Sequence, residues 1–366
     1  MKLLSKNKRT TPSITEWIKK TTLPNTERFL VEDNNKYSRL KILKKIIKLP
    51  LTPIDELTTD DILKHTPLFT KILKKRGGKQ CILRLVPMIP SLPKIRKKGN
   101  TLNNNLKWFN NQKRNIDLKK YKVEIIPRCN KIAWASIFII NDAGAWGEII
   151  RGGLSQLIRG NCYNTPIMFS TDFKKIILSK EDKEARKFLK KAINKLRVTK
   201  YTTKKLLRKK LNSKFNKYGY IKGYFEFTVW YKKSIKFIDY NRLQDDTLKN
   251  YNVWDTVEKK QEKLLGICVG SGIAQGVARV VTNPKKNHFE KGDILITKMI
   301  TIDYIPLMVK AGAIVTERGT ILSHAAIISR ELKKPYIAAV KNATKKIKDG
   351  KKIFINANKG IIRILK

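Results

Sequence analysis

The sequence predicts a mixed α/β (α+β) protein of 366 residues, long enough for two or three domains. Apolar residues recur at helical spacing in lysine-rich stretches within 1–79 and 178–215. Strand-like apolar runs, bounded by Pro, Gly and Asn, fill most of the remaining chain. Hydrophobic residues make up 41% of the chain, which is sufficient for ordinary cores.

The N-terminal region, residues 1–79, is expected to be mainly helical. Apolar side chains recur at helical spacing within 14–18 and 40–47, with lysines between them in the second segment. Two prolines interrupt the pattern, and a further helix is expected over 59–68. No chemical motif falls in this region, so we expect it to serve packing or a partner surface.

Strands are expected next, at 81–90, 121–127, 133–140 and 146–150. The segment Asn141–Gly144 has the composition of a hairpin turn between the last two. Residues 93–99 contain four cations and a proline, and are expected to form a basic loop, solvated if it stands alone and phosphate-facing if a nucleotide site lies beside it. A lysine-rich helical stretch follows over 178–215, with one apolar face.

A second hairpin is expected within 224–242, and it carries carboxylates. Because strand residues two apart share a face, Asp239 and Asn241 point the same way, and the hairpin brings Glu226 close to them. Two carboxylates and an amide oxygen suit Mg²⁺ held beside nucleotide phosphates. Arg242 follows at the strand end as a candidate phosphate contact. The alternative interpretation is an edge hairpin with solvated polar ends.

His324 lies where a strand over 313–315 runs through a glycine-containing turn into a short helix. Ser323 is a favourable N-cap residue, and the helix pattern continues to about Leu332. A helix N-terminus presents free N–H groups and positive potential, so this position can hold a phosphoryl group on the imidazole, with Arg318 adding charge. The alternative is a capping or core histidine.

The net charge of +51 is unusually high. Such a field attracts ATP and other polyanions, and predicts salt-sensitive, non-specific binding to nucleic acid. The four cysteines are far apart in the sequence, which predicts neither a disulfide framework nor a zinc site. No apolar run approaches the ~18 residues of a membrane span, so we expect a cytoplasmic protein without membrane association.

The C-terminal quarter resembles the swivelling phosphohistidine domain of the pyruvate phosphate dikinase and phosphoenolpyruvate synthase family. Four segments carry the resemblance in order: 266–280 (GICVGSGIAQGVARV), 292–296 (GDILI), 316–331 (TERGTILSHAAIISRE) and 350–362 (GKKIFINANKGII). The resemblance implies a swivelling β/β/α domain over 265–366, with His324 as the phosphorylated residue. Residues 244–264 are polar and charged with few apolar residues, which predicts a helical or flexible linker, and a swivelling domain needs one so that the histidine can visit two sites.

The hairpin around Glu226 resembles the metal site that closes an ATP-grasp domain, a likeness that extends over 80–243. It implies an ATP-grasp-like nucleotide-binding region that uses ATP and Mg²⁺, with Glu226, Asp239 and Asn241 as metal ligands. Arg84 and Lys94 are candidate phosphate contacts beside Arg242 and Arg318.

Together, the two resemblances imply a phosphotransferase that phosphorylates His324 from ATP and passes the group to an acceptor. The chain ends at Lys366, directly after the histidine domain. We therefore expect the acceptor, pyruvate-like or another small molecule, on a separate subunit or between the two domains. The alternatives are a non-catalytic phosphocarrier or regulatory subunit charged by a partner, and a basic nucleic-acid-binding protein.

Overall fold

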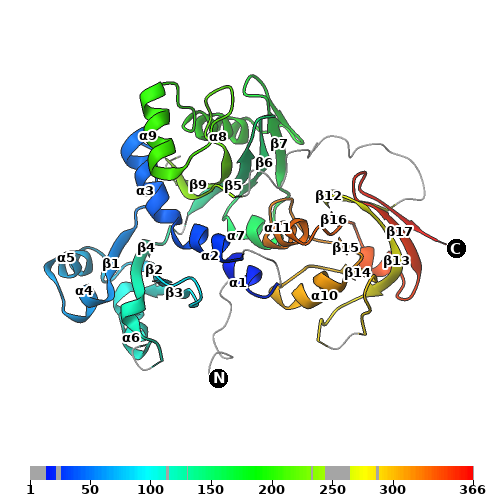
Figure 1. Cartoon of the computed structure of the whole chain (residues 1–366), viewed down its shortest axis with the longest axis horizontal. Helices are drawn as coiled ribbons and strands as arrows, with labels where there is room; N and C mark the ends of the chain where they lie inside the picture. Colours follow the sequence, from blue (N-terminus) through cyan, green and yellow to red (C-terminus); the bar gives the residue numbers. More distant parts are fainter. Residues whose placement is uncertain are drawn as a thin grey trace.

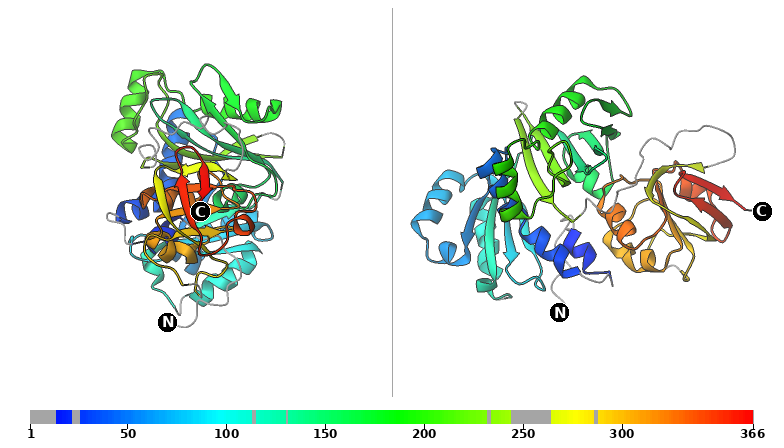
Figure 2. Two further views of the ribbon diagram at one scale, coloured as in Figure 1. Left: turned by 90° about the vertical axis from the view of Figure 1, so that its right-hand side faces the viewer. Right: turned by 45° about the horizontal axis from the view of Figure 1, so that its top comes forward.

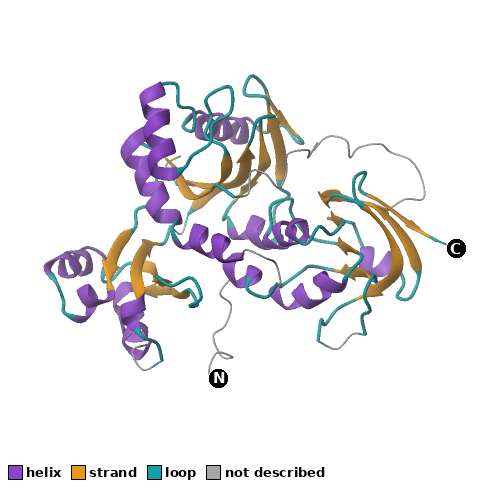
Figure 3. Cartoon of the chain, in the orientation of Figure 1, coloured by secondary structure: helices purple, strands orange, loops and turns teal. Residues whose placement is uncertain are grey.

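The computed structural model describes residues 14–21, 26–112, 115–129, 131–231, 234–243, 264–285 and 288–365. These residues form three sheets, each with helices packed against it (Figures 1 and 3). The predicted mixed α/β class is confirmed. Among the helices described, none is both long enough and apolar enough to span a membrane.

The first lobe is built on an antiparallel sheet with the order β1-β4-β2-β3. Its strands are β1 (Asp55–Thr58), β2 (Gln80–Pro87), β3 (Ile95–Thr101) and β4 (Tyr121–Pro127). The helices α4 (Thr59–Leu63), α5 (Pro67–Arg76) and α6 (Leu102–Gln112), with the 3-10 turn Leu118–Lys120, complete it. Leu83 and Leu85 of β2 point to the same face of the sheet as Val123 of β4. All three side chains are fully buried in the core of this lobe.

This lobe corrects three expectations. The segment 93–99 is not a loop but contributes to edge strand β3, and an edge strand tolerates lysine and arginine because one side stays unpaired. The predicted helix over 59–68 is two helices, because Thr66 caps α5 and Pro67 occupies its first turn. The boundary at 79/80 falls inside the lobe, since β1 pairs with β4.

The second lobe contains a six-stranded antiparallel sheet with the order β10-β9-β5-β6-β7-β8. Its strands are β5 (Ile132–Ile140), β6 (Ala145–Arg151), β7 (Ile167–Thr171), β8 (Ile176–Leu178), β9 (Gly223–Trp230) and β10 (Ser234–Asn241). Both predicted hairpins are present. The stretch 178–215 forms two helices, α8 (Lys183–Asn194) and α9 (Tyr201–Leu211), which cover one sheet face together with α3 (Lys36–Ile47).

The third lobe contains an eight-stranded mixed sheet with the order β11-β18-β17-β13-β14-β15-β16-β12. The strands are β11 (Leu264–Leu265), β12 (Ile267–Gly270), β13 (Ile273–Val280), β14 (Ile294–Thr297), β15 (Ala313–Thr316), β16 (Tyr336–Ala338), β17 (Lys352–Asn356) and β18 (Ile361–Ile364). The helices are α10 (Ile305–Lys310), α11 (His324–Glu331) and α12 (Ala343–Lys346), with a 3-10 turn at Ile302–Tyr304. Of the expected linker, residues 244–263 lie outside the described residues.

One apolar cluster joins the second and third lobes. It combines Ile137 and Ile150 of the six-stranded sheet with Leu295 and Ile314 of the third lobe, all fully buried. The helices α1 (Ile14–Ile18), α2 (Thr26–Asn34) and α7 (Ser155–Arg159) lie at this junction beside α11 (Figure 1). Figure 2 shows the third lobe against the other two, with the C-terminus at its outer end. The third lobe is therefore docked on the face of the six-stranded sheet opposite to the one covered by α3, α8 and α9.

Candidate functional site

A pocket of about 470 Å³ lies where the three lobes meet. The first lobe contributes cationic side chains from β2, β3 and the end of β4, while β9 and β10 contribute carboxylates and an amide. The helices α2 and α3 add one wall, and α11 of the third lobe adds His324. Of the residues predicted for the site, the pocket brings together Arg84, Glu226, Asp239, Asn241 and His324.

The two predicted carboxylates face each other across the hairpin. Glu226 of β9 stands directly opposite Asp239 of β10, next to a register shift that begins after Phe237. Tyr224 shares the strand face of Glu226 and donates its hydroxyl to Oε1 of that carboxylate, at 2.6 Å. Burial, followed by the negative charge of Asp239, raises the pKa of Glu226. The pair therefore holds more negative charge than its surroundings readily accommodate.

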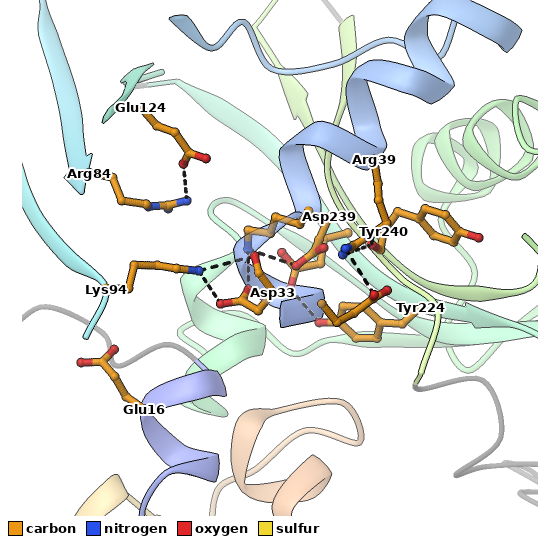
Figure 4. A network of polar contacts seen from close by, with 12 residues as sticks. Glu16, Asp33, Arg39, Arg84, Lys94, Glu124, Tyr224, Asp239 and Tyr240 are labelled. Carbon is orange, nitrogen blue, oxygen red and sulfur yellow. Dashed lines mark hydrogen bonds and ion pairs between the residues drawn. The ribbon is translucent and has the colours of Figure 1, made fainter. Parts of the chain in front are cut away.

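A lysine from the N-terminal helices lies between Asp33 and Asp239 of the pocket, and Figure 4 shows these two acids together with Lys94. Nζ of Lys36, at the start of α3, is 3.1 Å from Asp239 Oδ2 and 3.3 Å from Asp33 Oδ1. Asp33 also accepts from Lys94 Nζ at 2.6 Å. Burial alone would raise the pKa of Asp33, but the two ammonium groups lower it well below its usual range. The pocket thus contains a buried chain of alternating charges.

The acid pair fits a divalent cation. Oδ1 of Asp239 is buried and has no hydrogen-bond donor among the described residues, so one carboxylate oxygen remains to be satisfied. No cluster of three or more His, Cys, Asp or Glu residues suited to a metal occurs in the described part of the chain. The site would therefore combine Glu226 and Asp239 with the amide of Asn241, whose Oδ1 also accepts from the Leu243 amide at 2.9 Å.

The opposite wall of the pocket is cationic. Arg84, Arg96, Lys98 and Arg128 line it from β2, β3 and the residue after β4. Arg84 is paired with Glu124 at 3.2 Å, yet its buried Nε has no acceptor among the described residues. Burial in the pocket, followed by the positive charges of the neighbouring Arg96 and Arg84, lowers the pKa of Lys98. Crowded cations with unmet hydrogen-bonding capacity are suited to a polyphosphate.

His324 begins α11, as predicted, and Ser323 is its N-cap. Oγ of Ser323 accepts from the Ala326 amide at 3.3 Å. The imidazole makes an edge-on contact with the indole of Trp17, with ring centroids 6.0 Å apart. Burial lowers the pKa of His324 to about 3. The ring is therefore neutral at physiological pH, with a nitrogen lone pair available as a nucleophile.

Three predicted phosphate contacts, Lys94, Arg242 and Arg318, do not line the pocket themselves. Lys94 is engaged by Asp33. Arg242 donates Nε to Glu32 Oε1 at 3.0 Å, and Arg318 donates Nη1 to Asn161 Oδ1 at 3.0 Å. Phosphate binding by these side chains stays a prediction.

Sequence reasoning missed Asp33, Lys36 and Trp17. Lys36 and its partner Asp239 in the hairpin are 203 positions apart in the sequence, so no local spacing could reveal their contact. One signal was present: Glu32 and Asp33 are adjacent acids directly after the apolar run Phe29–Val31, in a chain with only 29 acidic residues. Both are buried, which for a charged side chain requires a partner.

Comparison with known proteins first defines the class of the third lobe. Residues 289–360 match the family model described as "PEP-utilising enzyme, mobile domain". This segment contains the turn that carries His324, as well as α10, α11 and α12. The resemblance predicted from the sequence is confirmed for the C-terminal domain.

Individual relatives narrow the comparison. The chain is 40% identical over 124 residues to phosphoenolpyruvate synthase from Aquifex aeolicus, a match that covers 33% of this chain and 14% of that protein. It is 40% identical over 104 residues to rifampicin phosphotransferase from Bacillus cereus, covering 28% and 12%. The matched part of the chain thus spans about one seventh or one eighth of the length of these relatives.

Among solved structures, D-alanine-D-alanine ligase from Coxiella burnetii aligns with 56% of this chain and 46% of its own, at 10% identity and a TM-score of 0.30.

Proposed function

We propose that this protein is a phosphotransferase that phosphorylates His324 from ATP with Mg²⁺ and then passes the phosphoryl group to an acceptor. One observation carries the proposal: His324 of the third lobe lines the same pocket as Glu226 and Asp239 of the second. The relatives named as a synthase and a phosphotransferase support it.

The pocket divides the work among its walls. Glu226, Asp239 and Asn241 would hold Mg²⁺, which when bound neutralises phosphate charge. Arg96 and Lys98 would bind the phosphate oxygens from the opposite side. Apolar side chains of the pocket, such as Ile82 of β2 and Ile158 of α7, would contact the adenine base of ATP.

The chemical step then needs little further machinery. The neutral imidazole of His324 attacks phosphorus, a P–N bond forms, and the P–O bond to the nucleotide breaks with its electron pair on the departing phosphate. The N-terminus of α11 would offer backbone N–H groups to the new phosphoryl group. Because the pKa of His324 is about 3, no proton has to leave the attacking nitrogen first.

The acceptor is proposed by class. A small molecule, pyruvate-like or otherwise, or a group presented by a separate subunit would collect the phosphoryl group from His324. The cationic wall suits an acceptor that carries negative charge, since it attracts anions in general.

Labelled ATP tests the proposal. The purified protein is incubated with γ- or β-labelled ATP, with Mg²⁺ or with EDTA, and the protein-bound label is analysed under alkaline conditions that preserve phosphohistidine. We expect label on the wild type with Mg²⁺, none with EDTA, and none on His324→Asn. The label that is retained identifies the transferred phosphate.

Two further results separate the alternatives. Label on His324 that appears only when a cell extract is added, and that is unaffected by Glu226→Gln, would show a phosphocarrier charged by another protein. Absence of label with every donor, together with steeply salt-dependent RNA binding, would contradict the proposed activity and favour a nucleic-acid-binding protein.

A further inference from the structure

A buried carboxyl group outside the pocket contacts the turn that carries His324. Glu148 lies in the middle of β6, between Ile137 and Met168 of the neighbouring strands, and its side chain is 1% exposed. Trp146 and Ile150 share its sheet face and belong to the apolar cluster shared with the third lobe. A lone carboxyl group on such a face needs a partner.

That partner comes from the other lobe. The Ile321 amide donates to Glu148 Oε2 at 3.1 Å, and the Leu322 amide also contributes. Among the described residues, no donor from the second lobe itself reaches this carboxyl group. The contact therefore exists only while the third lobe is docked, and it falls three residues before His324.

The same turn is held at two more points. Thr320 Oγ1 donates to the Leu157 carbonyl of α7 at 2.8 Å, which is a second contact between the lobes. From inside the third lobe, Arg330 Nη1 donates to the Ile321 carbonyl at 2.8 Å. The peptide groups of Ile321 are thus bonded on both sides, to Glu148 through nitrogen and to Arg330 through oxygen, so the turn has little freedom to tilt.

We propose that Glu148 is a positioning residue, whose carboxyl group anchors the turn before His324 on the six-stranded sheet and so aims the imidazole into the pocket. Its catalytic consequence depends on the function proposed above, whereas the docking contact does not. Reacting groups lose rate steeply when misplaced, and a shift of about 1 Å can cost roughly 100-fold. Fixing the turn three residues from the nucleophile acts on that distance.

The proposal requires an acceptor oxygen at this position and not a charge. Burial raises the pKa of Glu148 to about 8, opposed by the two backbone hydrogen bonds, so the neutral carboxyl form is favoured at neutral pH. A neutral carboxyl group accepts through its carbonyl oxygen, as a glutamine side chain does. Glu148→Gln should therefore preserve docking, while Glu148→Leu should not.

Two measurements on the full chain test this. Hydrogen exchange reports on the peptide covering 317–323, and single-turnover labelling with ATP reports on His324. We expect Glu148→Leu to accelerate exchange in this peptide and to slow labelling by about 10- to 100-fold, with ATP affinity within about twofold of wild type. Glu148→Gln should match the wild type within about threefold in both.

Ser136→Ala is the matched control. It removes a buried hydrogen bond on the same strand pair, from Ser136 Oγ to the Glu148 carbonyl at 2.9 Å, but leaves the turn untouched. It should change neither measurement. If Glu148→Leu is not recovered folded, Glu148→Asp withdraws the carboxyl group from the turn and should show the same effects at smaller amplitude.

The outcomes distinguish the two proposals. Wild-type exchange in the folded Leu or Asp variant would overturn the anchoring role, whatever the activity. Faster exchange with unchanged labelling would overturn the catalytic consequence. If the wild type itself takes no label while exchange responds as expected, the proposed function fails and the docking contact stands.

Discussion

Glu226→Gln should stabilise the metal-free protein, although it removes a charged group from the centre of the pocket. Glu226 is buried opposite Asp239, and burial and the neighbouring charge raise its pKa above the usual 4.5. The folded protein then binds more protons than the unfolded chain between pH 4.5 and neutrality, so stability falls as the pH rises through this range. The glutamine variant should lose that decline, and its amide oxygen can still accept from Tyr224.

The expected size follows from linkage. One pKa unit corresponds to about 1.4 kcal/mol, so at pH 8 we expect a gain on the order of 1–3 kcal/mol in the free energy of unfolding. A change of 1 kcal/mol moves the melting temperature by roughly 2–4 °C for a domain of about 150–250 residues. Mg²⁺ at 100 times its dissociation constant should stabilise the wild type by about 2.7 kcal/mol and the variant far less.

Thermal unfolding followed by tryptophan fluorescence measures both effects, in EDTA and in Mg²⁺, at pH 5 and pH 8. Glu290→Gln is a suitable control, because it removes an exposed carboxylate and should change stability by less than about 0.5 kcal/mol. The assignment of Glu226 and Asp239 as an acid pair that binds a cation would be refuted by either of two results. One is a Glu226→Gln variant less stable than wild type in EDTA at pH 8, and the other is a variant that Mg²⁺ stabilises as much as the wild type.

Lys36→Met should cost about 3–5 kcal/mol in urea unfolding, because it leaves two buried carboxylates without the ammonium group between them; a cost below 1 kcal/mol would contradict the network. Trp17→Ala should admit water to the imidazole of His324 and raise its pKa from about 3 toward 6.5, so that NMR detects a titration between pH 5 and 8 that the wild type lacks. Gly160→Ala and Gly350→Ala share the strain of a positive φ, +66° and +77°. The Cβ added at Gly160 would lie 2.9 Å from the Cα atom of Gly319 in the third lobe, whereas the Cβ added at Gly350 would meet nothing within 4 Å. Thermal unfolding should therefore show an extra cost of about 1–3 kcal/mol for Gly160→Ala, and equal costs would argue against tight docking at α7.

Much of the architecture could be predicted because the strands and helices have local sequence patterns of apolar spacing and capping residues. The alternation of apolar residues located the strands of both hairpins, and the Ser-His pair located the start of α11. The face shared by Asp239 and Asn241 followed from strand periodicity, and the expected hairpin brought Glu226 close to them.

The contacts of the helices with the site could not be predicted in this way. Lys36 and Asp33 reach the pocket through tertiary packing, and their spacing in the sequence carries no trace of it. The strand β3 was missed because its residues are charged, and charges are tolerated there because β3 is the edge strand of its sheet. Burial also decides the protonation of His324, and burial is a property of the assembled lobes.

The apolar cluster shared by the second and third lobes bears on the timing of any catalytic cycle. If the histidine domain travels to a distant acceptor, Ile137 and Ile150 become wetted each time it leaves, and this opposes departure. Resting molecules would then wait with the nucleophile already at the nucleotide, and the outward excursion would be brief. An acceptor partner with an apolar surface that covers Leu295 and Ile314 would lengthen that excursion. Transfer of the phosphoryl group to the acceptor, and not phosphorylation of His324, would then be the step most open to control.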